Sequence, residues 1–229
     1  GGDSISTWGF AAFARCGRLL REVGPAILSG APGLDALSVD LVDQTPASPP
    51  WRRPGEPDAP AAPDFDGVID LWGAAGAIDA GLAVAIERTR GCASASARVI
   101  ETIEKDQLPR PAGARAPGVK FLSLMSFHAD LGAPAARRLW SHHAPLALDV
   151  HVGMERYVRD WVIDLAPGPM PVPRFDGVAE LHFPSVEAMM ERWFVSEAGR
   201  AAIVHDVGHF LARATRLYTS EHVLKRRDR

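Results

Sequence analysis

Apolar and polar residues alternate most regularly in the second half of the chain, where they predict four strands and two helices. The strands are expected at Val119–Phe127, Met154–Ile163, Val178–Phe183 and Leu217–Leu224. Between the first two strands, Pro134 suits a first helical turn, and Ala136, Leu139 and Trp140 give the helix a buried side. After the third strand, Ser185 can cap a helix with core-forming spacing at Val186, Met189, Met190, Trp193 and Phe194. This order, β-α-β-β-α-β, predicts a ferredoxin-like unit.

The first half carries a similar but weaker pattern. We expect a short strand at Ser4–Trp8, an amphipathic helix over residues 9–22, and a strand at Gly33–Val42. Residues 43–64 contain seven prolines, which rule out regular structure there. A turn and strand follow at Phe65–Trp72, then a helix to about residue 90 and a strand at Val99–Ile103. Residues 106–117 read as a linker.

Matching positions indicate that the two halves are repeats of one unit. Pro25 and Gly33 lie 120 residues before Pro145 and Gly153, whereas Phe65–Val68 lies 110 residues before Phe175–Val178. The two offsets differ because the first half has a longer loop, and the extra residues fall within its proline-rich stretch. We therefore predict an α+β protein with domains at residues 1–108 and 118–229: two ferredoxin-like units that pack in one chain as an intrachain α+β barrel.

Composition excludes several kinds of protein. The net charge is −3 with both signs spread along the chain, so no basic surface indicates nucleic-acid binding. No apolar run approaches the length of a membrane span, and no signal peptide opens the chain, so we expect a cytoplasmic protein. The two cysteines, Cys16 and Cys92, cannot form a CxxC metal motif.

All eight histidines lie in the second half, which points to chemistry in that half alone. His142 and His143 stand where an amphipathic helix meets Pro145, and this proline is expected to fix the exit of the chain from the helix. The position of His143 holds Val23 in the first half, and valine carries no proton. We expect one working cleft in the second half, with the first half as its packing partner.

Several motifs in residues 118–226 together resemble the EthD family of dimeric α+β barrels. They are the strand Val119–Leu124, Trp140, His143-Ala144-Pro145, Tyr157, Asp176-Gly177, Glu180 and Glu221-His222. The resemblance implies a sheet packed against a second sheet, and a role in catabolic or secondary metabolism. Phe127 and His128 replace the basic residues that this family often has at the end of its first strand, so anion binding there is not implied.

The resemblance assigns His143 as the acid or base, and Tyr157 could hold a developing oxyanion in the same cleft. The alternatives are a buried histidine bonded to backbone and a core tyrosine. His142 is expected to be solvated or to support the site, and Asp176-Gly177 to form a turn. Further candidates for substrate binding are His128, Trp140, His142, Trp161, His182 and His222.

His205 and His209 lie four residues apart and could share a metal ion on a helix, although the apolar stripe beside them favours a solvated face. We expect no metal. The sequence has no glycine-rich phosphate loop, nucleophile elbow or cysteine nucleophile, so cofactor-free proton chemistry remains.

We therefore expect a cofactor-independent lyase or isomerase that dehydrates, decarboxylates or isomerises a hydrophobic, aromatic or polyketide-like molecule. The alternative is a non-catalytic protein that binds an apolar ligand for a degradation pathway. Oxygen-dependent chemistry without a cofactor is a third possibility. The chain could also associate as a homodimer.

Overall fold

The computed structural model describes residues 7–14, 18–46, 48–51, 66–89, 93–167 and 174–226, with backbone only for residues 7–14, 93 and 94. Cys16, Cys92, Ser4–Ser6 and the proline-rich stretch beyond Trp51 lie outside these ranges. Within them no helix is long and apolar enough to cross a lipid bilayer.

The described part of the first half forms four strands and two helices, with a π-helical turn directly before the first helix. They are β1 (Thr7–Ala14), η1 (Leu19–Val23), α1 (Gly24–Gly30), β2 (Leu34–Leu41), β3 (Gly67–Gly73), α2 (Ala75–Arg88) and β4 (Ala93–Asp106). The expected elements at residues 33–42, 65–72 and up to residue 90 are confirmed.

The predicted helix over residues 9–22 is wrong, because residues 7–14 form strand β1. This strand pairs with β3 on one side and β4 on the other. A strand in the middle of a sheet reads as a nearly continuous apolar run, and the helical spacing of Phe10 and Phe13 is a coincidence of that run. The helical turns begin only at Leu19.

The second half follows a short strand, β5 (Ala114–Arg115), which lies within the expected linker and pairs with β9. Its elements are β6 (Val119–Phe127), α3 (Ala133–Val150), β7 (Arg156–Pro167), β8 (Gly177–Phe183), α4 (Val186–Glu191), α5 (Glu197–Val207) and β9 (Leu211–Lys225). All four predicted strands are confirmed. The helix after Ser185 is shorter than expected, and a second helix capped by Ser196 follows it.

Helix α3 does not end at Pro145, contrary to the expectation; it continues through this residue to Val150. Proline lacks the N–H that would bond to the carbonyl four residues earlier, so one helical hydrogen bond is lost. Buried residues on both sides of the proline, Ala144, Ala147 and Val150, pack the helix onto the sheet. This packing offsets the missing bond, so the turn that carries His143 stays regular.

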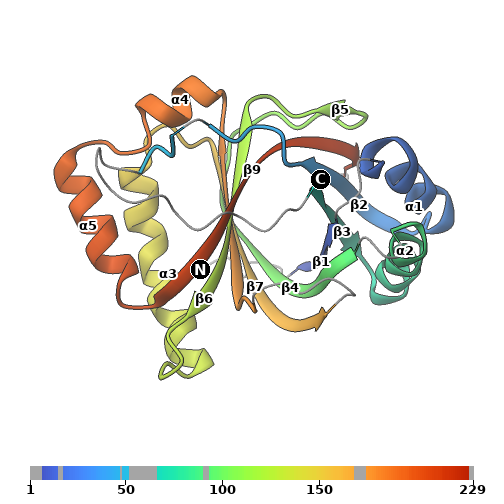
Figure 1. Ribbon diagram of the computed structural model, residues 1–229, viewed down its shortest axis with the longest axis horizontal. Helices are drawn as coiled ribbons and strands as arrows, with labels where there is room; N and C mark the ends of the chain where they lie inside the picture. Colours follow the sequence, from blue (N-terminus) through green and yellow to red (C-terminus); the bar gives the residue numbers. More distant parts are fainter. Residues whose placement is uncertain are drawn as a thin grey trace.

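All strands join one antiparallel sheet in the order β2-β3-β1-β4-β7-β8-β6-β9-β5, and an additional pairing of β2 with β9 closes it. Helices α1 and α2 cover the outside of the sheet in the first half, and α3, α4 and α5 cover it in the second half (Figure 1). The outer cores are different in kind: the first is aliphatic, whereas the second is rich in aromatic residues.

Strand alternation divides the side chains between these helix-covered faces and the inside of the closed sheet. On β6, Phe121 and Met125 join the core under α3–α5, whereas Leu122 and Leu124 join a separate apolar cluster inside the sheet. Lys120 lies on the same inward face as Leu122. The inside is therefore apolar in one part and charged in another.

Candidate functional site

The predicted acid or base, His143, lies on the buried side of α3 with its side chain only 9% exposed. Its Nδ1 lies 2.7 Å from Oδ2 of Asp206, near the end of α5. The Phe210 ring packs edge-on against the imidazole at 5.4 Å between centroids. Burial lowers the pKa of His143 below its usual 6.5, and this effect outweighs the opposing influence of Asp206. The imidazole is therefore neutral at pH 7.

Tyr157 and Trp140 lie in the same layer as His143, between the sheet and α3. The indole N–H of Trp140 donates a hydrogen bond to the Tyr157 hydroxyl, and burial raises the pKa of this tyrosine. The Trp140 ring also covers Gly177, where an added Cβ would approach the ring to 2.7 Å. Tyr157 thus keeps its own proton available for donation.

Trp161 and His128 line a separate cavity of about 460 Å³ where β6 ends and α3 begins. Trp161 stacks on Phe127 at 5.3 Å, with the Arg137 guanidinium over its outer face. His128 Nε2 lies 3.0 Å from the Gly208 carbonyl. Arg174, Asp176 and Arg213 complete the polar part of the cavity wall. Phe127 and Trp161 therefore line a cavity, but neither Trp140 nor His143 is among the residues that line it.

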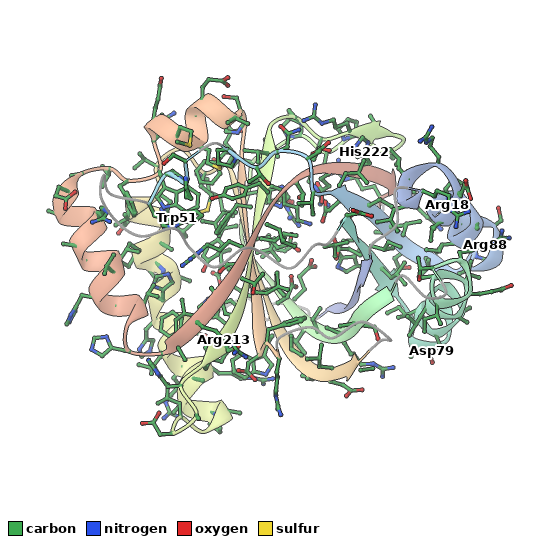
Figure 2. All side chains as sticks on the ribbon, in the orientation of Figure 1. Arg18, Trp51, Asp79, Arg88, Arg213 and His222 are labelled. Atoms are coloured by element: carbon green, nitrogen blue, oxygen red, sulfur yellow. The ribbon has the colours of Figure 1, made fainter. Side chains whose placement is uncertain are left out.

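The structure separates the remaining predicted residues from this layer. His142 is exposed. His222 lies on the outer face of β9 near Ser220, where β9 pairs with β2 (Figure 2). His182 points to the inside of the closed sheet, where its Nε2 lies 3.0 Å from Arg156 Nη1. Burial lowers the pKa of His182 to about 4, so it is neutral at pH 7.

His205 and His209 are exposed and pack against one another at 4.8 Å between ring centroids, consistent with the solvated face. No group of three histidine, cysteine or acidic side chains within metal-binding reach occurs in the described ranges. Asp176 accepts a hydrogen bond from the Phe127 N–H at 3.0 Å, which fits a structural role for the Asp176-Gly177 pair.

A buried cluster of charges, which the sequence reasoning missed, occupies the inside of the sheet. Lys120 Nζ lies within 3.5 Å of carboxylate oxygens from four strands, with Asp40 at 2.8 Å, Glu180 at 3.1 Å, Asp70 at 3.2 Å and Glu221 at 3.5 Å. Burial alone would lower the pKa of Lys120, but the surrounding carboxylates raise it well above its usual value. The lysine is therefore a fixed cation.

Two arginines extend this cluster. Arg110 donates two hydrogen bonds to Glu221, both at 2.6 Å. Arg156 Nη1 donates to Glu180 at 3.3 Å, and its Nε lies 3.3 Å from Asp106 without hydrogen-bond geometry. Burial opposes ionisation of Glu180 and Glu221, yet the neighbouring cations hold both pKa values below normal.

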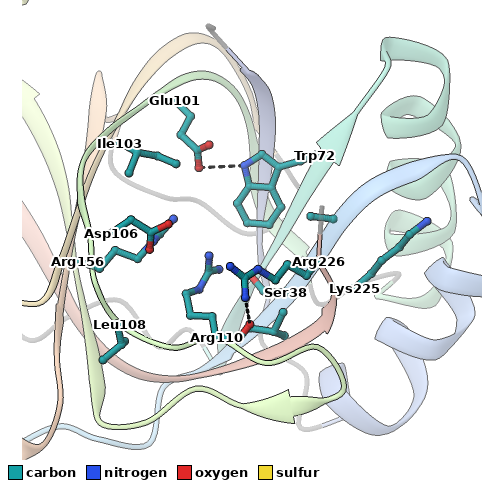
Figure 3. A pocket seen from close by; sticks show the side chains of 12 residues that line it. Ser38, Trp72, Glu101, Ile103, Asp106, Leu108, Arg110, Arg156, Lys225 and Arg226 are labelled. Atoms are coloured by element: carbon teal, nitrogen blue, oxygen red, sulfur yellow. Dashed lines mark hydrogen bonds and ion pairs between the residues drawn. The ribbon is translucent and has the colours of Figure 1, made fainter. Parts of the chain in front are cut away.

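A cavity of about 240 Å³ opens beside these charges at the mouth of the closed sheet (Figure 3). The Trp72 indole N–H donates to Glu101 at 3.1 Å on its wall. Arg110, Arg156, Lys225 and Arg226 contribute cations to the lining. A signal for this region was present in the sequence, as charged residues at alternate positions of otherwise apolar strands. It becomes interpretable only once the sheet is known to close.

Comparisons with known proteins find a match to one family model within the second half and a similarity in fold over the whole chain. Residues 128–214 match the EthD domain. A solved structure of an anthrone oxidase-like protein superposes with a TM-score of 0.62 and 10% identity, over 98% of this chain and 96% of that one. Chlorite dismutase from Candidatus Nitrospira defluvii, in complex with imidazole, gives a TM-score of 0.56 and 11% identity, over 96% and 93%.

No curated protein sequence matches the chain. The identities of the solved structures are low, so their similarity establishes the fold alone. The protein has a mixed α+β fold with a curled antiparallel sheet, similar to the fold of these solved structures, and its residues 128–214 match the EthD domain.

Proposed function

We propose that the protein is a cofactor-independent lyase or isomerase that acts on a hydrophobic aromatic or polyketide-like molecule, with His143 as acid and base. The observation that carries this proposal is the 2.7 Å contact between His143 Nδ1 and Asp206 Oδ2 at a buried imidazole. In the neutral ring, Nδ1–H donates to the carboxylate, which leaves the lone pair on Nε2. A neutral histidine with a fixed tautomer suits a general base at pH 7.

In the proposed reaction, Nε2 removes a proton from a carbon next to a carbonyl, and Asp206 stabilises the imidazolium that forms. The imidazolium then returns the proton to a second carbon in an isomerisation, or to a departing hydroxyl in a dehydration. Tyr157 supports the negative oxygen, because its hydroxyl accepts from Trp140 and keeps a proton to donate. The pKa of Tyr157 is raised, so the hydroxyl stays protonated.

A second candidate reaction shares the same first step. The similarity in fold to an anthrone oxidase-like protein motivates it. Here the carbanion passes electrons to dissolved oxygen, one oxygen atom enters the product and the other leaves as water. Oxygen consumption that depends on His143 would favour this reaction over the lyase or isomerase.

The test is a thermal-shift screen of aromatic acids, phenols and lactones, followed by turnover assays on His143→Ala. We expect His143→Ala to bind the hit and to lose about 10²- to 10⁴-fold in kcat. His205→Ala, an exposed histidine on α5, is the control and should keep full activity. If wild type and variant both bind the ligand and neither converts it, the result would instead support a non-catalytic binding protein.

We further infer that the chain arose by tandem duplication, with domains at residues 1–108 and 118–229. The strand order supports this, because β2, β3, β1 and β4 are consecutive in the sheet, as are β7, β8, β6 and β9. The order of strands along the chain is also the same in both halves. A homodimer of such chains stays a prediction, which light scattering would test.

A further inference from the structure

A segment of the first half reaches across the molecule and inserts a tryptophan into the aromatic core of the second half. After β2, Asp43 accepts hydrogen bonds from the Ser220 N–H at 3.1 Å and the Ser220 hydroxyl at 2.8 Å. The Gln44 N–H donates to the Tyr218 carbonyl at 3.2 Å. These bonds lead the chain along β9 to Trp51, which lies on the side of α3–α5, away from α1 and α2 (Figure 2).

Trp51 sits in a cage of three aromatic rings and one guanidinium. The Tyr218 ring is parallel to the indole at 5.9 Å, and the rings of Phe121 and Trp193 are tilted against it at 5.3 and 5.4 Å. The Arg216 guanidinium carbon lies 4.8 Å from the indole centroid. Aromatic walls with one cation over the ring are what a binding site for a flat aromatic molecule requires.

The cage contains two polar side chains to which Trp51 supplies neither a hydrogen bond nor a negative charge. The Tyr218 hydroxyl is buried and has no hydrogen-bond partner, in a residue only 4% exposed. Arg216 forms no ion pair within the described part of the chain, and burial lowers its pKa. Arg216 and Tyr218 lie two positions apart on β9, so their side chains point to the same outer face and are neighbours. An indole has no acceptor for the Arg216 guanidinium, and the Trp51 indole makes no hydrogen bond to the Tyr218 hydroxyl.

We propose that this cage is a binding site for a fused-ring aromatic molecule that carries an anionic oxygen, and that Trp51 occupies it as an internal competitor. The ring of the ligand takes the place of the indole. Its carboxylate or phenolate accepts from the Tyr218 hydroxyl and pairs with Arg216. Trp51 is only partly buried. Its departure breaks the hydrogen bond from Arg200 to its carbonyl at 2.9 Å, and the ring of the ligand replaces its aromatic and cation–π contacts.

The inference does not rest on the chemistry proposed for His143. The cage and His143 lie in one region of the second half: the Trp193 ring of the cage lies 5.1 Å from the His151 ring. The pKa of His151 is lowered by burial and, to a smaller degree, by His143. Binding in the cage is measured without turnover. Failure of either proposal can therefore be recognised while the other stands.

The experiment measures the affinity of 2-naphthoate and of its neutral analogue 2-naphthamide by calorimetry, for wild type and Trp51→Ala. If Trp51 competes for the site, its removal tightens 2-naphthoate binding by about tenfold or more, because the open state no longer has to be selected. Trp72→Ala removes a tryptophan from the other face of the sheet, where it bonds to Glu101, and should leave the affinity unchanged.

Two further variants separate a built site from a hole left by truncation. In the Trp51→Ala background, Arg216→Gln should abolish the preference for 2-naphthoate over 2-naphthamide, and Tyr218→Phe should weaken 2-naphthoate binding by about fivefold. Equal binding of both compounds, insensitive to both variants, would overturn the proposal. So would equal 2-naphthoate affinity in wild type and Trp51→Ala. If circular dichroism shows that Trp51→Ala is unfolded, Trp51→Leu replaces it. Arg216→Gln in the otherwise wild-type protein then gives a second test, because its loss of 2-naphthoate binding would support the proposal and unchanged binding would overturn it.

Discussion

The two faces of strands β6–β9 carry opposite kinds of side chain, and the difference indicates which face is built for ligands. Lys120 points inward to four carboxylates, whereas its neighbour Phe121 points outward into the aromatic layer. Tyr157 and Arg156 divide in the same way. The inner face combines these charges with the apolar cluster around Leu122 and Leu124, whereas the outer face is rich in aromatic residues.

The two faces differ in ion pairing more than in hydrogen-bond satisfaction, because Asp40 Oδ1 and Arg156 Nε inside lack a hydrogen-bond partner just as the Tyr218 hydroxyl does outside. Inside, each cation of the cluster meets at least one carboxylate, and the bidentate pair of Arg110 with Glu221 fixes β9 to the linker. Outside, the Tyr218 hydroxyl lacks a partner and the His143 dyad is set in an apolar layer. The inner charges therefore hold the strands together, and the outer polar groups are available to a ligand.

Lys120→Met should have the largest effect, because it removes the cation that four buried carboxylates share. Breaking a buried ion pair from one side costs about 3–5 kcal/mol. Urea unfolding followed by circular dichroism measures the loss. The matched control is Arg18→Met in the exposed pair with Glu22, which should cost no more than about 0.5 kcal/mol. Equal costs for the two variants would show that the inner cluster does not hold the sheet.

Asp206→Asn should have the next largest effect, on activity and not on folding. Without the carboxylate, the imidazolium loses its counter-ion, and an asparagine N–H that donates to Nδ1 would shift the ring proton to Nε2. We expect kcat/KM to fall by about 100-fold at pH 7, with unchanged urea midpoint. The pKa of His143 should fall further, because Asp206 opposes the effect of burial. The acid limb of the pH profile would then move to lower pH, whereas a purely structural role for Asp206 would leave it in place.

Asp160→Asn should have the smallest effect and the opposite sign. Burial, reinforced by Glu180, Glu101 and Asp70, raises the pKa of Asp160 well above its usual value, and its protonated carboxyl bonds to Glu180. A raised pKa in the folded state means that stability is lost as the pH rises from about 4 through that pKa. Asparagine keeps a donor to Glu180 and does not ionise.

The variant should therefore gain on the order of 1 kcal/mol over wild type at pH 7, and nothing near pH 3. Urea midpoints measured from pH 3 to pH 8 test this. A gain that is independent of pH would mean that Asp160 is not the group that titrates.

The sequence predicted the second half well because its strands alternate cleanly and its first helix has a clear apolar side. It failed at β1, a strand that pairs with a neighbour on each side and whose sequence shows no polar alternation. Of the candidate site residues, His143, Trp140 and Tyr157 share one layer, and their role in a site stays a prediction. His182 was grouped with them because nothing in one strand tells which face meets the helices. Asp206 and Trp51 were missed, since each reaches the site from a distant segment.

The pairing of β2 with β9 has a consequence for how the chain folds. Leu41 pairs with Ser220, so the bond that closes the sheet joins residues from nearly opposite ends of the described chain. Contacts so far apart in sequence form slowly, because a long loop must be ordered before they are gained. During synthesis Glu221 also arrives after every other carboxylate around Lys120. We expect sheet closure and completion of the ion cluster to be one late event, so a growing chain gains its native interior only when the final strand has been made.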